Sequence, residues 1–358
     1  MWNSPIFLSS YKVKNRIVFP PLSTNWAEID GAVNSRLLDF YREIALGGCG
    51  MITVAGTAIS PEGKGSDRSL CLWNDQHLTG FSHLAEAIRG NDCLAGIQLM
   101  HVGGQGNPLF TGFQPVSPSG IPCEALGFAS RPLTLDEIEL IRRKFLASAK
   151  LAYRAGFQAV ELHLAHGYLL HEFLAKRTNK RNDIYGGNAF NRLRLILEII
   201  DGVKMSAPGM ILGVRVSGRD FLKEGIGFSE NSLFLPVLED AGVDYFSVTA
   251  GVYDSSGAKQ QALQQGEFFT FAREIKSIVH KPVMGVGKIL VLEQAEFRLQ
   301  NDFCDLVAIG RALLADSSLV RKTLEGESID RCTECGECQY LKLGKSEVAC
   351  PLREEQYV

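Results

Sequence analysis

Residues 159–174, AVELHLAHGYLLHEFL, begin with a short apolar run and continue into a segment with helical periodicity. Three polar side chains stand where the apolar run ends: His163, His166 and Tyr168. Such a group is typical of an active site, because two imidazoles can donate hydrogen bonds to one carbonyl oxygen while a phenol supplies a proton to the neighbouring carbon. This chemistry needs a source of hydride, which predicts a flavin or nicotinamide site in the same chain.

The apolar run at the start of this stretch is one of eight along the chain. The eight runs cover residues 16–20, 51–55, 94–99, 159–162, 212–216, 245–248, 283–286 and 306–309. Helical periodicity separates most of them, at residues 37–46, 79–89, 135–155, 191–205, 231–241 and 267–279. Thr134 and Glu137 form a capping box that predicts the start of the third helix.

Apolar strands that alternate with helices predict a parallel sheet, and eight such units predict closure into a (β/α)8 TIM barrel. A doubly wound open sheet is the alternative. It is disfavoured because the chain contains no G-x-G-x-x-G motif and no Walker loop. We expect the barrel to span residues 1–328 and a Cys-rich extension to span residues 329–358. The long loop at residues 101–133 is rich in glycine and proline, and we expect it to form a lid or wall at the barrel mouth.

Composition excludes several classes of partner. The chain has 358 residues, 46% of them hydrophobic and 22% charged, which suffices for a large buried core. Its formal net charge of −3, without a polybasic block, disfavours nucleic acid and anionic membranes as partners. The sequence shows no leader-like segment and no apolar stretch of membrane-spanning length, so we expect a cytoplasmic protein.

The nine cysteines fall into two groups. Five are scattered and are expected to be inert core thiols: Cys49, Cys71, Cys93, Cys123 and Cys304. Four crowd near the end in the spacing C-x2-C-x2-C-x11-C: Cys332, Cys335, Cys338 and Cys350. That spacing predicts a metal site in a reducing compartment.

The last two predicted strands carry the motifs KPVMGVGKI and DLVAIGRALLADSSL. Barrels of this type bind phosphate through backbone N–H groups after strands seven and eight and through a helix N-terminus. Gly287, Lys288, Gly310 and Arg311 are therefore the candidate phosphate-binding residues. The alternative is that the glycines only relieve crowding at the strand ends.

Taken together, these motifs resemble the old yellow enzyme superfamily, flavoproteins that hold FMN in a (β/α)8 barrel. The resemblance spans nearly the whole chain. Besides the two closing motifs, it rests on KNRIVFPPLST, IQLMHVGG, ELHLAHGYLLHEFL, RTNKRNDIYGGNAFNRLR and GVRVSGRDF. The run from Tyr185 to Arg192, which reads YGG-x3-NR, is the most specific of these pieces.

The resemblance implies a set of FMN contacts. Pro21, Leu22 and Ser23 would lie along the flavin ring, Ala55 would border it, Gln98 would bond its pyrimidine edge, and Arg215 would face its N1. Ser23 stands where relatives often carry cysteine or threonine. Residues 103–105 read Gly-Gly-Gln where many relatives read Ala-Gly-Arg, so a contact from that loop is expected to be missing.

The resemblance also implies catalytic roles. His163 and His166 would bind the carbonyl oxygen of an enone-like small molecule, flavin N5 would deliver hydride to the distal alkene carbon, and Tyr168 would protonate the nearer carbon. His171 is expected to be structural. Arg177 and Tyr253 are further substrate-binding candidates, and Tyr253 falls near a position where dienoyl-CoA reductases carry histidine.

The four terminal cysteines resemble the 4Fe–4S segment of the 2,4-dienoyl-CoA reductase and trimethylamine dehydrogenase branch. A zinc site and free thiols are the alternatives. With a cluster, electrons would come from a separate donor protein; without one, NADPH or NADH would reduce the flavin directly. The sequence leaves the number of subunits open, a homo-oligomer included.

Two other reactions remain open at this stage. The first is oxidative demethylation of an amine by the same flavin. The second is a metal-dependent aldolase or isomerase that would use His163, His166 and Glu161 as ligands. The period-2 alternation of a strand disfavours it, because Glu161 and His163 share a face while His166 lies beyond the strand end.

Overall fold

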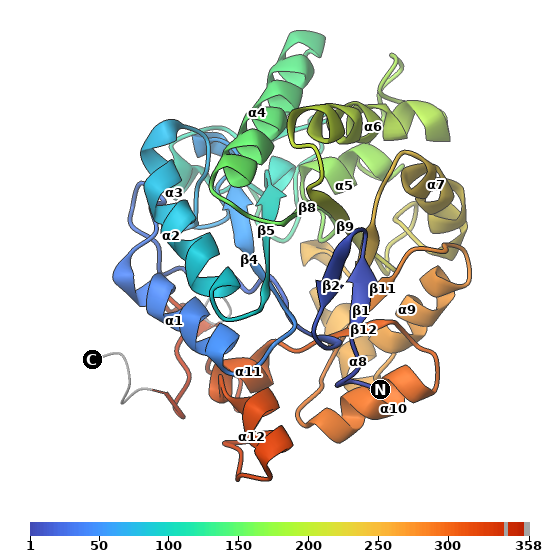
Figure 1. Ribbon diagram of the computed structural model, residues 1–358. Coiled ribbons are helices and arrows are strands. Elements are labelled where there is room, and N and C mark those ends of the chain that lie inside the picture. Colours follow the sequence, from blue (N-terminus) through green and yellow to red (C-terminus); the bar gives the residue numbers. More distant parts are fainter. Residues whose placement is uncertain (340–342, 354–358) are drawn as a thin grey trace.

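Eight parallel strands close into a barrel in the computed structural model, which describes residues 1–339 and 343–353 (Figure 1). They follow one another around the barrel in chain order, and pairing between Val307 and Ile17 closes the ring. The strands are β3 (Ile17–Phe19), β4 (Met51–Ala58), β5 (Leu94–Met100), β8 (Ala159–Leu164), β9 (Ile211–Ser217), β10 (Tyr245–Thr249), β11 (Val283–Val286) and β12 (Leu306–Ala308). The predicted TIM barrel is confirmed, and with it all eight predicted strand positions.

Helices surround the barrel (Figure 1). They are α1 (Ser35–Leu46), α2 (Leu78–Arg89), α4 (Leu135–Arg154), α5 (Leu169–Leu174), α6 (Ala189–Ser206), α7 (Phe228–Asp240), α8 (Ser256–Gln265), α9 (Phe268–Lys276), α10 (Leu292–Gln300), α11 (Arg311–Ala315) and α12 (Leu319–Glu325). The predicted capping box is present, since Thr134 accepts from the backbone N–H of Glu137 and the Glu137 side chain accepts in return.

Apolar spacing explains why the helices pack against the strands. In α4, Ile138, Ile141, Phe145 and Ala149 recur every three or four residues and are all buried. Every residue of the eight barrel strands is buried except the half-buried Val286 at the end of β11, as expected for parallel strands between helices and a filled barrel. A hairpin of β1 (Ile6–Leu8) and β2 (Tyr11–Val13) covers the amino ends of the barrel strands and adds Leu8 and Val13 to the core there.

The segment at residues 101–133 contains more structure than a bare loop. It holds the short helix α3 (Pro108–Thr111) and a pair of two-residue strands, β6 (Val116–Ser117) and β7 (Arg131–Pro132). Its residues Gln105 and Cys123 line a small cavity beside the barrel mouth. The segment therefore walls a side cavity, and its role as a lid or wall over the barrel mouth itself stays a prediction.

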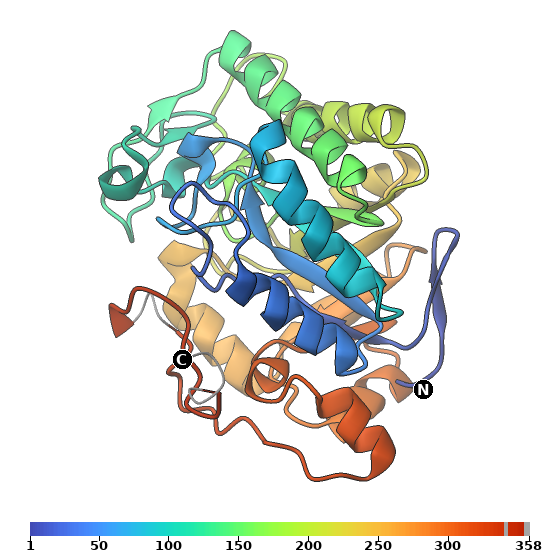
Figure 2. The same cartoon turned by 60° about the vertical axis from the view of Figure 1, so that its left-hand side comes forward.

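The segment after α12 runs away from that helix along the flank of the barrel (Figure 2). Its later part is anchored to the loop after β3, because Val348 N–H donates to Thr24 O at 2.9 Å and Trp26 Nε1 donates to Val348 O at 3.0 Å. Of the predicted extension 329–358, residues 340–342 and 354–358 lie outside the described part of the chain.

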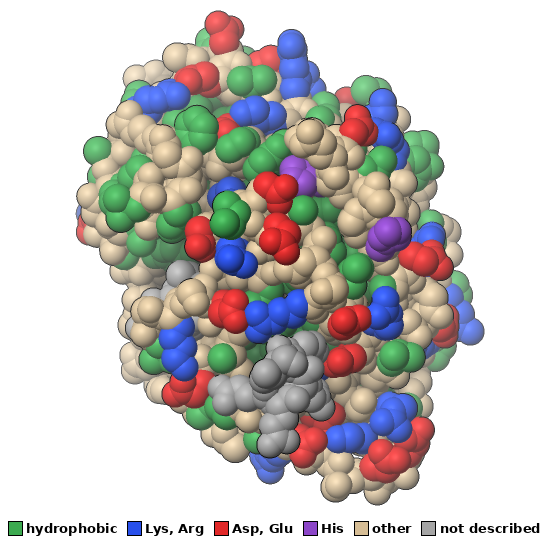
Figure 3. Space-filling view, turned by 90° about the vertical axis from the view of Figure 1, so that its left-hand side faces the viewer, with side chains coloured by type: hydrophobic (Ala, Val, Ile, Leu, Met, Phe, Trp, Pro, Cys, Tyr) green, Lys and Arg blue, Asp and Glu red, His purple; other side chains and the backbone are tan. Residues whose placement is uncertain are grey.

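Basic and acidic side chains are interspersed on the face drawn in Figure 3, in keeping with the small net charge. Across residues 1–339 and 343–353, no helix combines the length and the apolar character needed to cross a bilayer.

Candidate active site

Two adjoining cavities open at the carboxyl ends of the strands. The first, here called the histidine cavity, has a volume of about 200 Å³, and the second, the glycine cavity, about 380 Å³. His166 and Arg215 line both, so the two form one continuous site. A site of this combined size suits a cofactor with a substrate above it.

The predicted residues divide between the two cavities. The histidine cavity holds Pro21, Ser23, Gln98, His163, Tyr168 and Tyr253 in addition to the shared pair. The glycine cavity holds Leu22, Gly287, Lys288, Gly310 and Arg311. Predicted residues on or after seven of the eight strands thus converge on one mouth, as the barrel topology predicts.

His163 and His166 meet at the centre of the site. His163 Nε2 lies 3.1 Å from His166 Nδ1, and His166 Nε2 lies 3.0 Å from the hydroxyl of Thr249, the last residue of β10. The backbone N–H of Ala165 donates to His163 Nδ1 at 3.2 Å, which leaves the His163 proton on Nε2. His163 then donates to His166 Nδ1, and His166 donates from Nε2 to Thr249.

The turn that carries His166 is held in an unusual conformation. His166 has φ +61°, a left-handed conformation that is rare for residues other than glycine, and Gly167 follows with φ +80°. Gln105 Nε2 donates to the carbonyl oxygen of His166 at 2.8 Å and holds the turn. Strained backbone of this kind is common at functional sites.

Tyr168 stands against the histidine pair. Its ring centroid lies 4.8 Å from that of His163, and its hydroxyl lies 3.0 Å from the hydroxyl of Tyr253. Tyr168 is the N-cap residue of α5, so the helix start fixes its position beside the turn. The three side chains that the sequence singled out therefore lie together.

Burial keeps both imidazoles neutral. Desolvation lowers the pKa of His163 and of His166 well below the usual value; Arg215 adds to the effect at His163, and Lys259 does so at His166. A neutral imidazole still donates one hydrogen bond, so the pair can bind an oxygen without carrying charge.

A buried carboxyl group, that of Glu161, accepts two hydrogen bonds inside the barrel. Glu161 accepts from Gln98 Nε2 at 2.7 Å and from the Tyr245 hydroxyl at 3.1 Å. Desolvation raises its pKa, and Arg215 opposes that rise. Gly213 allows the arrangement, because a Cβ there would fall 2.0 Å from Tyr245 Cζ.

Two predicted positions need adjustment. Ala55, expected to border the flavin, lines neither cavity; its neighbour Gly56 lines the histidine cavity, at a register shift in β4. A Cβ on Gly56 would fall 2.6 Å from Met100 Sδ, so a larger residue there would displace the Met100 side chain. Three residues that line the cavities were not predicted from the sequence: Gly56, Met100 and Thr249. A search for polar residues at strand ends would have found Thr249.

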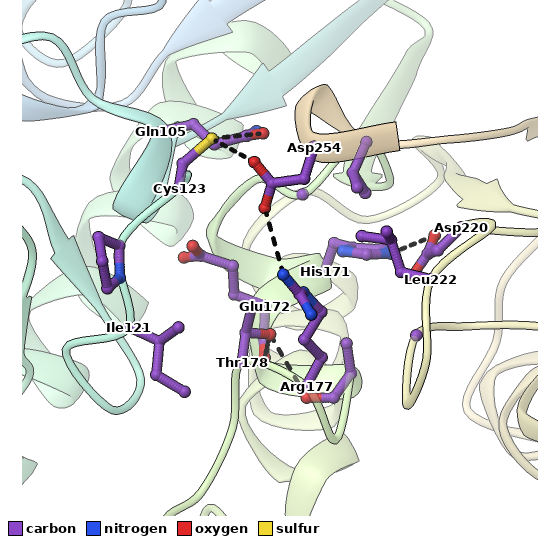
Figure 4. Close-up of a pocket in the computed structure, with 15 residues that line it drawn as sticks. Gln105, Ile121, Cys123, His171, Glu172, Arg177, Thr178, Asp220, Leu222 and Asp254 are labelled. Carbon is purple, nitrogen blue, oxygen red and sulfur yellow. Dashed lines mark hydrogen bonds and ion pairs between the residues drawn. The ribbon is translucent and has the colours of Figure 1, made fainter. Parts of the chain in front are cut away.

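Arg177 lies outside both cavities. It lines a cavity of about 40 Å³ next to the histidine cavity, where it lies 3.8 Å from Asp254 (Figure 4). Arg177 also contacts Glu124 at 2.9 Å. His171 lines the same cavity and bonds Asp220 through Nε2 at 3.0 Å, which supports a structural role. Arg177 therefore does not line the site formed by the two cavities, and its substrate-binding role stays a prediction.

The four terminal cysteines line one small pocket together with Arg311. Burial, with the neighbouring thiols, raises the pKa of Cys338 and of Cys350. Within the described ranges, no three His, Cys, Asp or Glu side chains are grouped closely enough for a single metal ion. The four thiols, as they lie here, do not form a single-ion site, and Glu161 with the two histidines does not form the one that a metal-dependent aldolase would need. The five scattered cysteines are buried, as predicted.

Comparisons with known proteins agree with this geometry. Residues 3–329 match the model of the NADH:flavin oxidoreductase / NADH oxidase family. The chain is 39% identical over 330 residues to an NADH oxidase from Thermoanaerobacter brockii, covering 90% of this chain and 51% of that one. It is 34% identical over 322 residues to an NADPH dehydrogenase from Bacillus velezensis, covering 89% and 92%.

Among solved structures, a complex of 2-naphthoyl-CoA reductase with 2-naphthoyl-CoA superposes with a TM-score of 0.91 at 26% identity. The match covers 98% of this chain and 56% of that one, so the chain spans about half the length of some relatives and nearly all of others. Its match to the family model and its identity to full-length relatives place the chain in the old yellow enzyme (NADH:flavin oxidoreductase / NADH oxidase) family of FMN-binding, flavin-dependent NAD(P)H oxidoreductases.

Proposed function

We propose that this protein uses FMN and NAD(P)H to reduce the activated carbon–carbon double bond of an α,β-unsaturated carbonyl compound. The observation that carries the proposal is the meeting of His163 Nε2 and His166 Nδ1 at 3.1 Å, with Tyr168 against them in the same cavity. Two imidazoles that line one cavity can give up their mutual hydrogen bond to bind one oxygen, and the adjacent phenol can reach the carbon beside it.

The residues present fit FMN. Arg215 is 7% exposed, and its Nε and Nη1 atoms have no hydrogen-bond partner within the described chain, so an acceptor in the cavity would satisfy them. Gln98 uses its Nε2 on Glu161 and keeps Oε1 for a donor. Lys288 and Arg311 line the other end, where a phosphate would need cations. When bound, FMN supplies the hydride that the alkene carbon receives.

The histidine pair prepares the carbonyl compound. His163 can redirect its Nε2 proton from His166 to the carbonyl oxygen. His166 gives a second hydrogen bond if its proton moves to Nδ1 and Nε2 accepts from Thr249, whose hydroxyl can serve as donor or acceptor. Both bonds withdraw electron density from the distal alkene carbon, which makes that carbon the acceptor of hydride.

Tyr168 completes the addition. Its Oη gives a proton to the carbon next to the carbonyl, so that one hydride and one proton add across the double bond. The hydroxyl of Tyr253, 3.0 Å away, is placed to return a proton to Tyr168. NAD(P)H is consumed and NAD(P)⁺ is formed.

The terminal cysteines extend this proposal. Cys332, Cys335, Cys338 and Cys350 offer four thiols around one pocket, a donor set that suits a 4Fe–4S cluster. A cluster there would let a separate protein deliver electrons in place of NAD(P)H.

A parallel assay of enones and amines tests the proposal. The protein, purified without oxygen, is expected to carry FMN and to oxidise NADPH or NADH when a simple cyclic enone is added. A saturated ketone of the same size is the matched control and should not be turned over. Oxidation of an amine with a dye acceptor, together with no turnover of any enone, would favour the oxidative alternative and contradict this proposal.

A further inference from the structure

Glu334, which lies between Cys332 and Cys335, reaches the cation pair of the glycine cavity. Its Oε1 lies 3.3 Å from Lys288 Nζ and 3.7 Å from Arg311 Nη2. Arg311 lines both the glycine cavity and the cysteine pocket. The carboxylate therefore sits on the wall that separates the terminal cysteines from the predicted phosphate-binding end of the cofactor site.

The backbone of Glu334 is strained. Its φ of +57° lies in the left-handed region, which favours glycine, and the same loop uses a glycine for its other positive φ, at Gly336. A residue with a side chain is destabilised in this region relative to glycine. The contacts with Lys288 and Arg311 give a physical reason why a carboxylate stands there.

We propose that Glu334 weakens the binding of the cofactor phosphate and so sets how strongly the site prefers FMN over riboflavin, a proposal that rests on the FMN site proposed above. Lys288 and Arg311 together offer two positive charges to a phosphate. The carboxylate cancels one of them and repels the phosphate itself. Riboflavin has the same ring without the phosphate and is insensitive to this charge.

Solvent moderates the effect. The side chains of Lys288, Arg311 and Glu334 are 37%, 26% and 32% exposed, so water and salt screen their interaction. Removing one charge from such a site is expected to change phosphate affinity by roughly three- to thirty-fold at low salt. The change should shrink as salt rises.

The test measures the dissociation constants of FMN and riboflavin for the flavin-depleted full chain by quenching of flavin fluorescence. Glu334→Gln should tighten FMN binding by roughly three- to thirty-fold at low salt and leave riboflavin binding unchanged. Most of the effect on FMN binding should be lost at about 0.5 M salt. Glu337→Gln is the matched control, because Glu337 lies in the same segment but contacts Lys345. It should leave both constants unchanged.

Glu334→Gly separates the charge from the strain. It should tighten FMN binding as Glu334→Gln does and also raise the melting temperature, because glycine adopts the left-handed conformation without cost. An unchanged ratio of FMN to riboflavin affinity in both variants, or weaker FMN binding, would overturn the inference. A wild-type chain that binds neither flavin would instead overturn the proposed function, and this inference with it.

Discussion

His163 Nε2 lies 3.1 Å from His166 Nδ1, and the second nitrogen of His166 ends on the hydroxyl of Thr249. The two imidazoles and the hydroxyl form one relay, in which the His163 proton stays on Nε2 while the His166 proton can lie on either ring nitrogen. Thr249 therefore decides whether His166 can present an N–H to a bound oxygen. Because Thr249 is the last residue of β10, the barrel fixes the position of this hydroxyl beside His166.

Thr249→Val should lower kcat/KM for an enone by about three- to ten-fold, the value of one neutral hydrogen bond. The variant retains the shape of threonine but cannot donate to His166 Nε2, so the Nδ1–H form of His166 loses its support. Thr249→Ser restores the hydroxyl and should restore most of the activity. Equal losses in both variants would show that Thr249 acts through packing alone.

The pH dependence follows from the buried histidines. Because their pKa values lie well below the usual value, neither imidazole gains a proton as pH falls through 6.5. The kcat/KM for an enone should therefore stay level from pH 8 to about pH 5.5. The unfolded chain does bind protons in this window, so unfolding free energy should decrease as pH falls below 6.5.

A fall in kcat/KM with an apparent pKa near 6.5 would contradict neutral, buried imidazoles. His166→Asn provides the control for stability. It removes one titrating group, so part of the loss of unfolding free energy between pH 7 and about pH 5 should disappear in that variant.

Arg215→Met should weaken FMN binding by roughly ten-fold or more, because it removes charged donors that face the cavity. Fluorescence quenching gives the dissociation constant. Arg219→Met is the matched control, since Arg219 packs over the ring of Phe271 and lines neither cavity. Equal affinity in wild type and Arg215→Met would remove Arg215 from the cofactor site.

The cysteine pocket makes a compositional prediction. Protein purified without oxygen should contain about four iron and four sulfide per chain, and Cys335→Ser should lose both. Cys304→Ser is the control, because Cys304 is buried, does not line the pocket, and has its pKa raised to about 12 by burial. Full iron content in Cys335→Ser, or zinc in place of iron, would reject the cluster.

The barrel could be predicted because its strands and helices carry local signals. Apolar runs such as residues 94–99 fall within observed strands, and Thr134 with Glu137 marks a helix start that the structure reproduces. Helix α7 begins three residues before its predicted start, at Phe228, because Gly227 precedes it in an extended conformation that apolar periodicity does not reveal.

The residues that make up the site could largely be predicted from the sequence, whereas their hydrogen-bond and ion-pair partners could not. His163, His166 and Tyr168 are close in sequence, so their strand end alone brings them together. The partners Thr249 and Glu334 come from distant segments, and only the closed barrel and the path of the terminal segment reveal them. The residue of β4 predicted to border the flavin was Ala55, whereas its neighbour Gly56 lines the cavity. The register shift in β4 that causes this difference is not visible in the spacing of apolar residues.

Stopped-flow measurement of the two half-reactions in wild type and Tyr168→Phe tests the central claim most directly. Both proteins should bind FMN, and NADPH or NADH should bleach the flavin at the same rate in each. Reoxidation of the reduced flavin by an enone should be about 10²- to 10⁴-fold slower in Tyr168→Phe, because the proton donor is missing. Equal reoxidation rates, or a protein without bound flavin, would contradict the account.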